Sequence, residues 1–389
     1  MKIKIAHITQ SLGGVMTYLE HVFNYTNQEE YEFVVIAPEH YEFELFCKQH
    51  SVTYYPIKIQ RSINPVKDGS AFFKIISILR MERPDIVHTH SAKGGFIGRL
   101  AATFFDVRVV YSPHAFSYLS FKGMKRIIFY SLEYVAKKWT DVLLSVSFSE
   151  ANRAIYELDY DSYQVKTILN AIPVDENLPF RNYEQCIKIG MIGRLTYQKN
   201  PLLFLEVAFE MIKKNPLLEF SILGAGLTDH LACEIEDFIT KNKIRQNINI
   251  LSWGDNDTSR NFLKNQDLFV MTSVFEGLPF SLVEAMALGI PCVVSKVDGN
   301  TDVIQNYENG FSCLTKSEFQ KKIELLIESE DLRRQIGQAA YRYVKTTHDI
   351  NQNIKKLEEL YTDLHRHKLL NLKNIRINDT VTVNSASSF

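Results

Sequence analysis

Short apolar runs of strand length alternate with longer stretches of helical periodicity along most of this 389-residue chain. Such an alternation predicts parallel, doubly wound sheets, because each helix returns the chain to start a parallel neighbour. The predicted strands of the first half cover residues 3–8, 32–37, 52–56, 85–89, 107–112, 141–146 and 165–169. Those of the second half cover residues 186–192, 218–223, 247–252, 267–272 and 291–295. Since single cores stop growing near about 250–300 residues, we expect an α/β protein of two domains.

The domain boundaries follow from a polar, proline-containing stretch between the halves. We expect a first domain over residues 1–170, a linker over 171–185 and a second domain over 186–348. Helical periodicity continues through residues 349–369. The remaining residues, 370–389, are polar and aperiodic, which predicts a disordered tail.

Charge and cysteine content exclude several classes of protein. The formal net charge is −1 with a pI near 6.8, and no nucleic-acid-binding motif occurs, so nucleic acid is not an expected partner. The five cysteines are widely separated and odd in number, which favours a reducing cytoplasm and no structural zinc. No apolar run approaches the ~18 residues of a membrane span, and the N-terminus enters a strand directly. We therefore expect a protein that is neither exported nor membrane-spanning.

Two segments of the second half carry charged residues at loop and helix positions. In GMIGRLTYQKNP, residues 190–201, an apolar strand runs into a loop with Arg194 and Lys199. Two cations on one strand-to-helix loop suit an anionic ligand, since arginine can hold phosphate oxygens bidentately and lysine adds a mobile charge. In FEGLPFSLVEAMALG, residues 275–289, Glu276 precedes a short apolar helix and Glu284 lies on it. Either pair alone could be solvated loop and helix charges.

Together the two segments resemble the donor site of the family 4 retaining glycosyltransferases, which have the GT-B fold. The resemblance rests on Arg-x4-Lys followed about eighty residues later by Glu-x7-Glu, and it covers most of the chain. It implies two Rossmann-like domains facing each other across a cleft, with the first binding the acceptor and the second the nucleotide sugar. It also implies a last helix, residues 349–369, that crosses back to the first domain.

The resemblance assigns the leaving diphosphate to Arg194 and Lys199. Charge grows on this group in the transition state, so fixed cations accelerate the reaction. The backbone amides of Phe280, Ser281 and Leu282, at the positive end of the following helix, are further candidates for phosphate contacts. With these donors present no metal or other cofactor is required, and the nucleotide sugar is a co-substrate.

Other roles implied by the family concern the sugar and the ribose. Glu284 is expected to accept hydrogen bonds from the ribose hydroxyls, and Glu276 to lie beside the donor sugar. A carboxylate near the anomeric carbon could instead be a nucleophile, although the family is more often described as reacting on one face of the sugar. His114, just past a predicted strand, is expected near the reaction centre.

Several features of the first domain complete the predicted site. Gly13 and Gly14 match the family's glycine loop, with Gly14 expected at the donor and Gly13 at the acceptor. His90, and with less weight His88, are candidate acceptor contacts. His-x-His could suggest a metal, but no third ligand is evident in the sequence. The triplet at residues 255–257 mimics an Asp-x-Asp metal motif, and we interpret it as a metal-free loop.

The charge is uneven along the chain. Residues 51–140 contain fourteen Lys and Arg against five Asp and Glu. The basic and aromatic stretch FKGMKRIIFYSLEYVAKKW, residues 121–139, suits the interface of an anionic membrane. It could equally be an amphipathic core helix with a solvated basic face. A membrane-proximal enzyme would fit a polyprenyl-diphosphate-linked glycan acceptor, with the protein cytoplasmic and peripheral on the inner face of the cell membrane.

The resemblance therefore implies retaining transfer of a sugar onto a lipid-linked oligosaccharide in capsule or O-antigen synthesis. We favour a UDP donor, an N-acetylhexosamine, because the HTHSAKGG and SPHAF segments are similar to enzymes of that group. Alternatives are a GDP-mannose-dependent mannosyltransferase and a nucleotide-sugar 2-epimerase of the same fold, which needs no acceptor. A third alternative is a non-catalytic scaffold subunit. Such subunits tend to lose the charged residues of these motifs, but here all of them are present.

Overall fold

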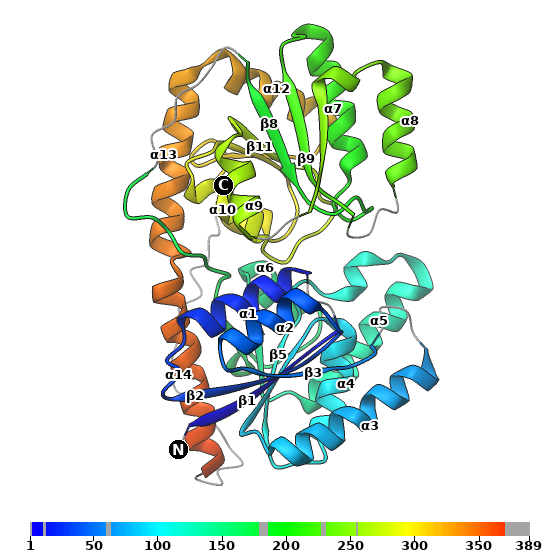
Figure 1. Ribbon diagram of the computed structural model, residues 1–389, viewed down its shortest axis with the longest axis vertical. Coiled ribbons are helices and arrows are strands. Elements are labelled where there is room, and N and C mark those ends of the chain that lie inside the picture. Colours follow the sequence, from blue (N-terminus) through cyan, green and yellow to red (C-terminus); the bar gives the residue numbers. More distant parts are fainter. Residues whose placement is uncertain are drawn as a thin grey trace.

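Two parallel sheets, one in each half of the chain, organise the molecule into two lobes (Figure 1). The computed structural model describes residues 2–10, 13–59, 64–178, 186–226, 231–253 and 256–369. Residues 179–185 of the predicted linker and residues 370–389 of the predicted tail lie outside this set. The two facing Rossmann-like lobes confirm the predicted fold class.

The first sheet has the order β3-β2-β1-β4-β5-β6-β7. Its strands are β1 (Ile3–Thr9), β2 (Tyr31–Ala37), β3 (Thr53–Pro56), β4 (Ile86–His90), β5 (Arg108–Ser112), β6 (Val142–Ser145) and β7 (Val165–Thr167). Its helices are α1 (Gly13–Tyr25), α2 (Tyr41–Gln49), α3 (Pro65–Glu82), α4 (Ala92–Ala102), α5 (Gly123–Ala136) and α6 (Phe148–Tyr156).

The second sheet has the order β10-β9-β8-β11-β12-β13. Its strands are β8 (Lys188–Ile192), β9 (Glu219–Ala225), β10 (Ile248–Ser252), β11 (Leu268–Met271), β12 (Cys292–Ser295) and β13 (Phe311–Cys313). The helices after β8 are α7 (Pro201–Lys214), α8 (Ala232–Asn242), α9 (Asn256–Lys264), α10 (Phe280–Ala287), α11 (Asn300–Val303), α12 (Lys316–Glu328), α13 (Glu330–Thr347) and α14 (Ile350–Leu369).

Each of the twelve predicted strands is present, and among the strands described only β13 was not predicted. This strand has three residues, as β7 has, but β7 continues into apolar Ile168 and Leu169, whereas polar Thr315 and Lys316 soon follow β13. The strand β13 is therefore recognisable only by its pairing with β12. The predicted metal-free loop at residues 255–257 was also misplaced, because α9 already begins at Asn256; Asp255 lies outside the described residues.

Local sequence explains where the helices begin. An Asn-Pro pair starts both α3 and α7: the Asn64 side chain accepts from the Lys67 amide at 3.1 Å, and Asn200 accepts from the Leu203 amide at 3.4 Å. The following proline occupies the first helical position, where its missing N–H costs nothing. The helix α7 is thereby started directly after the loop that carries Arg194 and Lys199.

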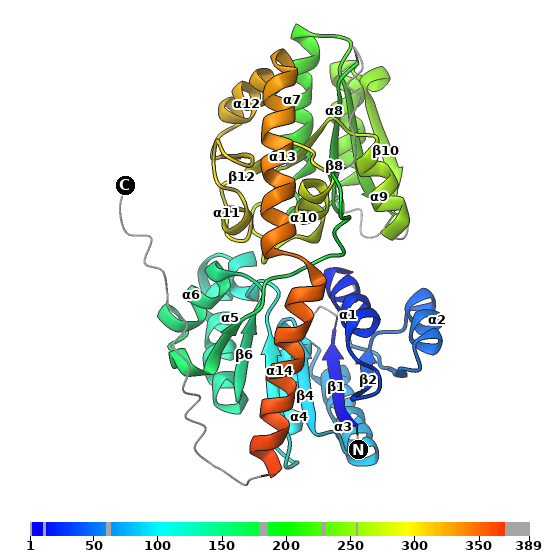
Figure 2. The same cartoon turned by 90° about the vertical axis from the view of Figure 1, so that its left-hand side faces the viewer.

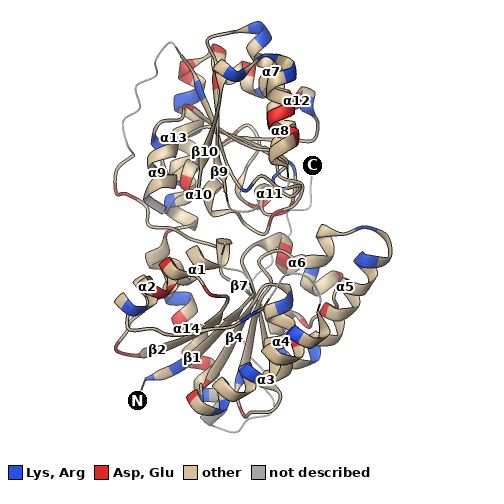
Figure 3. Ribbon diagram, turned by 45° about the vertical axis from the view of Figure 1, so that its right-hand side comes forward, with Lys and Arg blue, Asp and Glu red and all other residues tan. Residues whose placement is uncertain are grey.

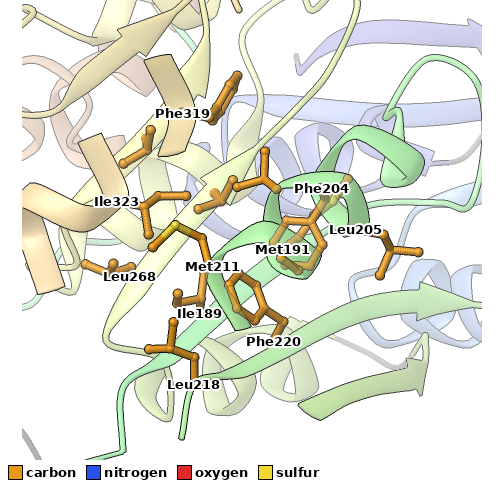
Figure 4. Packing of buried hydrophobic residues seen from close by; sticks show 14 of the residues in the cluster. Ile189, Met191, Phe204, Leu205, Met211, Leu218, Phe220, Leu268, Phe319 and Ile323 are labelled. Carbon is orange, nitrogen blue, oxygen red and sulfur yellow. The ribbon is translucent and has the colours of Figure 1, made fainter. Parts of the chain in front are cut away.

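The core of the second lobe lies between its sheet and the covering helices α7 and α12 (Figure 4). Ile189 and Phe220 of neighbouring strands are fully buried against Phe204 of α7 and against Phe319 and Ile323 of α12. Packing on this side fixes the strands, so that their carboxyl ends present loops at one edge of the sheet.

The helix α14 leaves the second lobe and runs along the first, as predicted (Figure 2). Leu357, Leu360, Tyr361 and Leu364 are buried there as part of the first lobe's core. The two lobes are therefore joined by apolar packing as well as by the chain between them.

In each sheet the strand order reverses beside the first strand, between β1 and β4 and between β8 and β11. In doubly wound sheets ligands bind at the carboxyl ends of the strands at such a switch point. The loops after β1, β4 and β5 and those after β8 and β11 are consequently where a site is expected.

Candidate active site

The loops after β8 and β11 bring Lys199 and Glu276 together. The Lys199 Nζ donates to Glu276 Oε1 at 2.5 Å, and the two side chains are only 15% and 7% exposed. A Cβ on Gly193 would lie 2.9 Å from Lys199 Cγ, so the glycine allows the lysine to fold back over the end of β8. Arg194, the next residue, is partly buried at the same strand end. Both predicted phosphate-binding cations thus lie at the switch point.

The helix α10 begins directly behind this pair. Its N-cap is Pro279, and the Leu282 amide already donates to Pro279 O at 3.2 Å. Phe280 and Ser281 precede Leu282 in the first turn, where a helix leaves amides without carbonyl partners of its own. Of the three predicted amides, those of Phe280 and Ser281 remain candidates for phosphate contacts. The prediction for the Leu282 amide is corrected, because this amide donates to the Pro279 carbonyl in the first turn of the helix.

Glu284 lies one turn further along α10 and is partly buried. Burial raises the pKa of its carboxyl from the ordinary 4.5 to about 7, and the charge of Arg260 on α9 offsets part of this rise. The carboxylate is poorly compensated by the protein, which suits a group that receives its hydrogen bonds from a ligand.

Gly277 closes the site against the first lobe. A Cβ at this position would lie 2.9 Å from Ala115 N and 3.0 Å from His114 C, so only glycine permits the approach. His114 and Ala115 have φ values of 52° and 83°, a left-handed conformation that is strained for residues with a side chain. The structure thereby places predicted His114 beside predicted Glu276, although 162 residues separate them in sequence.

Further contacts between the lobes surround this point. Asn170 Nδ2 donates to Leu278 O at 2.8 Å, and Ser149 Oγ donates to Asp302 Oδ1 at 2.9 Å. Arg153 forms an ion pair with Asp298 across the same boundary. A small interlobe pocket is lined by Ala115, Phe116, Leu119, Ser147, Glu150, Arg153, Glu276, Gly277 and Asp298.

Glu150 also lines this pocket and was not among the residues predicted from the sequence. Its carboxylate accepts from Ala115 N at 2.7 Å and from Val146 N at 2.9 Å, while burial raises its pKa to about 7. It therefore holds the strained loop that carries His114. The signal available was the Ser-x-x-Glu helix start at Ser147, where Ser147 Oγ accepts from the Glu150 amide.

Gly13 and Gly14 begin α1 and are exposed. A Cβ on either would meet no described atom within 4 Å, so packing within the described parts of the chain does not demand glycine. The prediction that a ligand approaches this backbone closely would explain why glycine is present at both positions.

His88 and His90 are fully buried, unlike the acceptor contacts expected of them. His90 Nδ1 lies 3.0 Å from His114 Nε2, and His90 Nε2 lies 2.9 Å from His7 Nδ1. His88 pairs instead with Tyr361 and Ser112. We therefore correct both assignments: His90 lies behind His114, and His88 anchors α14.

Comparison with known proteins gives the following similarities. Residues 12–176 match the family described as Glycosyltransferase Family 4, and residues 178–343 match Glycosyl transferases group 1. A relative from Escherichia coli, the UDP-Gal:alpha-D-GlcNAc-diphosphoundecaprenol alpha-1,3-galactosyltransferase, is 28% identical over 383 residues, 93% of this chain and 97% of that protein. The capsular polysaccharide biosynthesis glycosyltransferase CapM of Staphylococcus aureus is 24% identical over 322 residues, covering 78% of this chain and 83% of CapM.

Among solved structures, Anabaena HepE in complex with UDP-glucose is similar with a TM-score of 0.77 and 18% sequence identity. The match covers 93% of this chain and all of that chain (100%). At this identity the similarity establishes the shared fold.

Proposed function

This chain belongs to the family 4 glycosyltransferases of the GT-B fold, and we propose that it transfers a sugar from a UDP donor to a polyprenyl-diphosphate-linked saccharide. It is an enzyme of surface polysaccharide synthesis, related to capsule and O-antigen glycosyltransferases. The donor proposal is supported by two similar proteins, the E. coli UDP-Gal-dependent galactosyltransferase and Anabaena HepE, whose structure is a complex with UDP-glucose. The acceptor proposal is supported by the diphosphoundecaprenol acceptor of the E. coli relative.

The observation that carries the proposal is the buried Lys199–Glu276 pair at the switch point of the second sheet. An arriving donor would bring its diphosphate to Lys199 and Arg194 and its sugar to Glu276. The lysine then exchanges one anionic partner for another whose charge increases as the glycosidic bond breaks. We assign the ribose hydroxyls to Glu284 and the phosphate oxygens also to the amides of Phe280 and Ser281.

His114 and Glu276 would flank the donor sugar from opposite lobes. Closure of the lobes at Gly277 excludes water from the reacting bond, which favours transfer over hydrolysis. Retention of configuration would then follow from reaction on one face of the sugar, with a leaving phosphate oxygen taking the acceptor proton. In this scheme the first lobe binds the acceptor, the second binds the donor, and no metal is needed.

A thermal-shift panel of nucleotide sugars tests the donor, because a ligand that binds only the folded state raises the melting temperature. The panel includes UDP-galactose, UDP-glucose, UDP-N-acetylhexosamines and GDP-mannose. A shift with a UDP sugar is expected and chooses between galactose and the N-acetylhexosamine favoured above. A shift with GDP-mannose alone would contradict the proposal that the donor is a UDP sugar. Conversion of a UDP sugar without any acceptor would favour the epimerase, which the transferase relatives do not support.

The acceptor proposal adds a membrane surface as a partner of α5. Residues 122–128 are all exposed at the start of this helix, with Met124 71% and Ile127 59% accessible beside Lys125 and Arg126. Figure 3 shows Lys and Arg on this helix and its neighbours. Apolar side chains between cations complement an anionic lipid surface. None of the helices in the described ranges is both long and apolar enough for a bilayer crossing.

The inner face of α5 shows why these apolar residues are not core residues. Its buried members are Glu133 and Ala136, and Glu133 Oε2 accepts from Arg99 Nη2 at 2.9 Å in the lobe interior. The predicted alternative, a core helix with a solvated basic face, does not account for exposed Met124, Ile127 and Ile128.

Flotation with vesicles tests this surface. We expect binding to phosphatidylglycerol-containing vesicles, weaker binding at high salt, and none to pure phosphatidylcholine. Ile127→Glu with Ile128→Glu should abolish flotation. The matched control, Leu325→Glu at an exposed position of α12 on the other lobe, should leave it intact. Equal flotation of both variants would exclude α5 as the docking surface.

A further inference from the structure

A row of three histidines runs inward from the proposed reaction centre. His114 follows β5, His90 ends β4, and His7 lies within β1. His114 Nε2 lies 3.0 Å from His90 Nδ1, and His90 Nε2 lies 2.9 Å from His7 Nδ1. His114 is partly exposed, whereas His90 and His7 are fully buried. The row thus connects a cleft residue to the core by two consecutive hydrogen bonds.

All three imidazoles are neutral near pH 7. Burial lowers the pKa of His7 to about 3 and that of His114 to about 4, and it lowers the pKa of His90 well below the ordinary 6.5. A neutral imidazole has one N–H and one lone pair, so each ring donates at one nitrogen and accepts at the other.

A metal ion does not explain the cluster, although His7, His88 and His90 have ring nitrogens within 4.8 Å of one another. His7 is the third histidine of this group, and no pattern in the sequence pointed to it. However, the 2.9 Å between His7 Nδ1 and His90 Nε2 is shorter than the ~3.3 Å that two nitrogens on one tetrahedral zinc require.

Both ring nitrogens of His88 form hydrogen bonds to residues outside the row. Ser112 Oγ donates to Leu144 O at 2.9 Å, so it must accept from His88 Nε2. His88 Nδ1 then accepts from the Tyr361 hydroxyl at 2.7 Å. Both nitrogens of His88 are used to hold α14, which leaves His7, His90 and His114 as a separate chain.

Only two arrangements of protons fit this chain. In the first, His7 Nδ1–H donates to His90, His90 Nδ1–H donates to His114 Nε2, and His114 carries its proton on Nδ1. In the second, every bond is reversed, and His7 must carry its proton on Nε2. His7 Nε2 is buried and has no hydrogen-bond partner among the residues that the structure describes. The second arrangement therefore leaves a buried N–H unsatisfied, a state that folded proteins rarely tolerate.

We propose that His90 and His7 are positioning residues that hold His114 as its Nδ1–H tautomer. Resting on the proposed function, this makes His114 a hydrogen-bond donor to an oxygen of the nucleotide sugar, such as a ring hydroxyl or a phosphate oxygen. It also means that His114 has no lone pair left for the acceptor hydroxyl. His114 is then not the base of the reaction, and the acceptor proton leaves by another group.

The tautomer can be measured in the intact enzyme without substrate. Selective ¹⁵N labelling of the eleven histidines and long-range ¹⁵N–¹H correlation distinguish Nδ1–H from Nε2–H rings. The signal of His114 is assigned by its loss in His114→Gln. We expect Nδ1–H for His114 in the wild-type protein. A predominantly Nε2–H ring would overturn the proposal whatever the donor turns out to be, whereas failure of the nucleotide-sugar panel would overturn the proposed function and leave the tautomer standing.

An isosteric pair of variants tests the role of His90. In His90→Asn an amide N–H can still donate to His114 Nε2, whereas in His90→Asp only a carboxylate oxygen is present and must accept from it. At pH 8.5 we expect His90→Asp to show an Nε2–H ring at His114. We also expect its kcat to fall roughly tenfold below that of His90→Asn, the value of about one lost hydrogen bond. Equal kcat and the same tautomer in both variants would show that His90 only fills space.

Discussion

Replacing Lys199 by alanine should affect catalysis and stability by separable amounts. If the lysine stabilises charge growing on the leaving diphosphate, its loss removes one transition-state donor, worth ~2.7–4 kcal/mol or about 10²–10³ in kcat. The same change leaves Glu276, only 7% exposed, without its 2.5 Å partner. Breaking a fully buried pair costs ~3–5 kcal/mol. The Lys199 side chain is 15% exposed, so water can partly replace it. We therefore expect the substitution to lower the free energy of unfolding by about 2 kcal/mol.

A double-mutant cycle separates the two effects. For a lobe of this size about 2 kcal/mol lowers the melting temperature by roughly 4–8 °C. Adding Glu276→Gln removes the unpaired charge, so the double variant should recover most of that melting temperature while its kcat remains low. Differential scanning fluorimetry without ligand and initial rates at saturating donor measure the two quantities. Lys213→Ala, which removes an exposed lysine paired with Glu210, is the matched control and should change both very little.

Two results would contradict this role of Lys199. A kcat within about threefold of wild type in Lys199→Ala would exclude a transition-state contact, because one such contact is worth at least ~10². Recovery of turnover in the double variant would show that the lysine matters only as the counter-ion of Glu276.

The other predictions concern binding, closure and metal. Glu284→Gln should weaken nucleotide binding by roughly tenfold or more, measured by calorimetry, since a charged acceptor is worth ~1.5–3 kcal/mol; unchanged affinity would remove the ribose assignment. The pKa of Glu284 is about 7 in the folded state and 4.5 in the unfolded state, so the folded state binds this proton more tightly. The resulting contribution to stability is fully present below pH 4.5 and is lost as the pH rises through 7. Glu284→Gln should therefore melt higher than wild type at pH 8 and show little difference at pH 4; a lower melting temperature at pH 8 would contradict the sign. Gly277→Ala places a methyl 2.9 Å from Ala115 N and should lower kcat with little change in nucleotide affinity, whereas normal turnover would show that this closure is dispensable. A chelator should leave activity unchanged, and its abolition would require a metal site.

Much of the fold was predictable because the relevant signals are local. A strand or helix shows its periodicity within its own residues, and an Asn-Pro pair starts a helix wherever it occurs. For the same reason Arg194, Lys199, Glu276 and Glu284 could be selected as candidates by spacing along two short segments. The strand β13 was missed because its three residues do not belong to a longer apolar run, unlike the equally short β7, which continues into Ile168 and Leu169.

The arrangement of the site depended on contacts between distant segments. Only the tertiary structure pairs Lys199 with Glu276, brings Gly277 of one lobe against Ala115 of the other, and shows that Glu150 holds the loop of His114. Burial and hydrogen bonding of His90 likewise follow from three strands meeting in one sheet, so no local pattern could have excluded it as an acceptor contact.

Local patterns along the chain were thus enough to predict two doubly wound sheets, sites at the ends of their strands, and the charged residues available for a donor. Which of those charges meet, which amides are already hydrogen-bonded and which histidines face the core became clear only from the folded chain. The physical reason is that periodicity and capping act over a few residues, whereas desolvation, ion pairing and tautomer choice depend on neighbours that folding alone supplies.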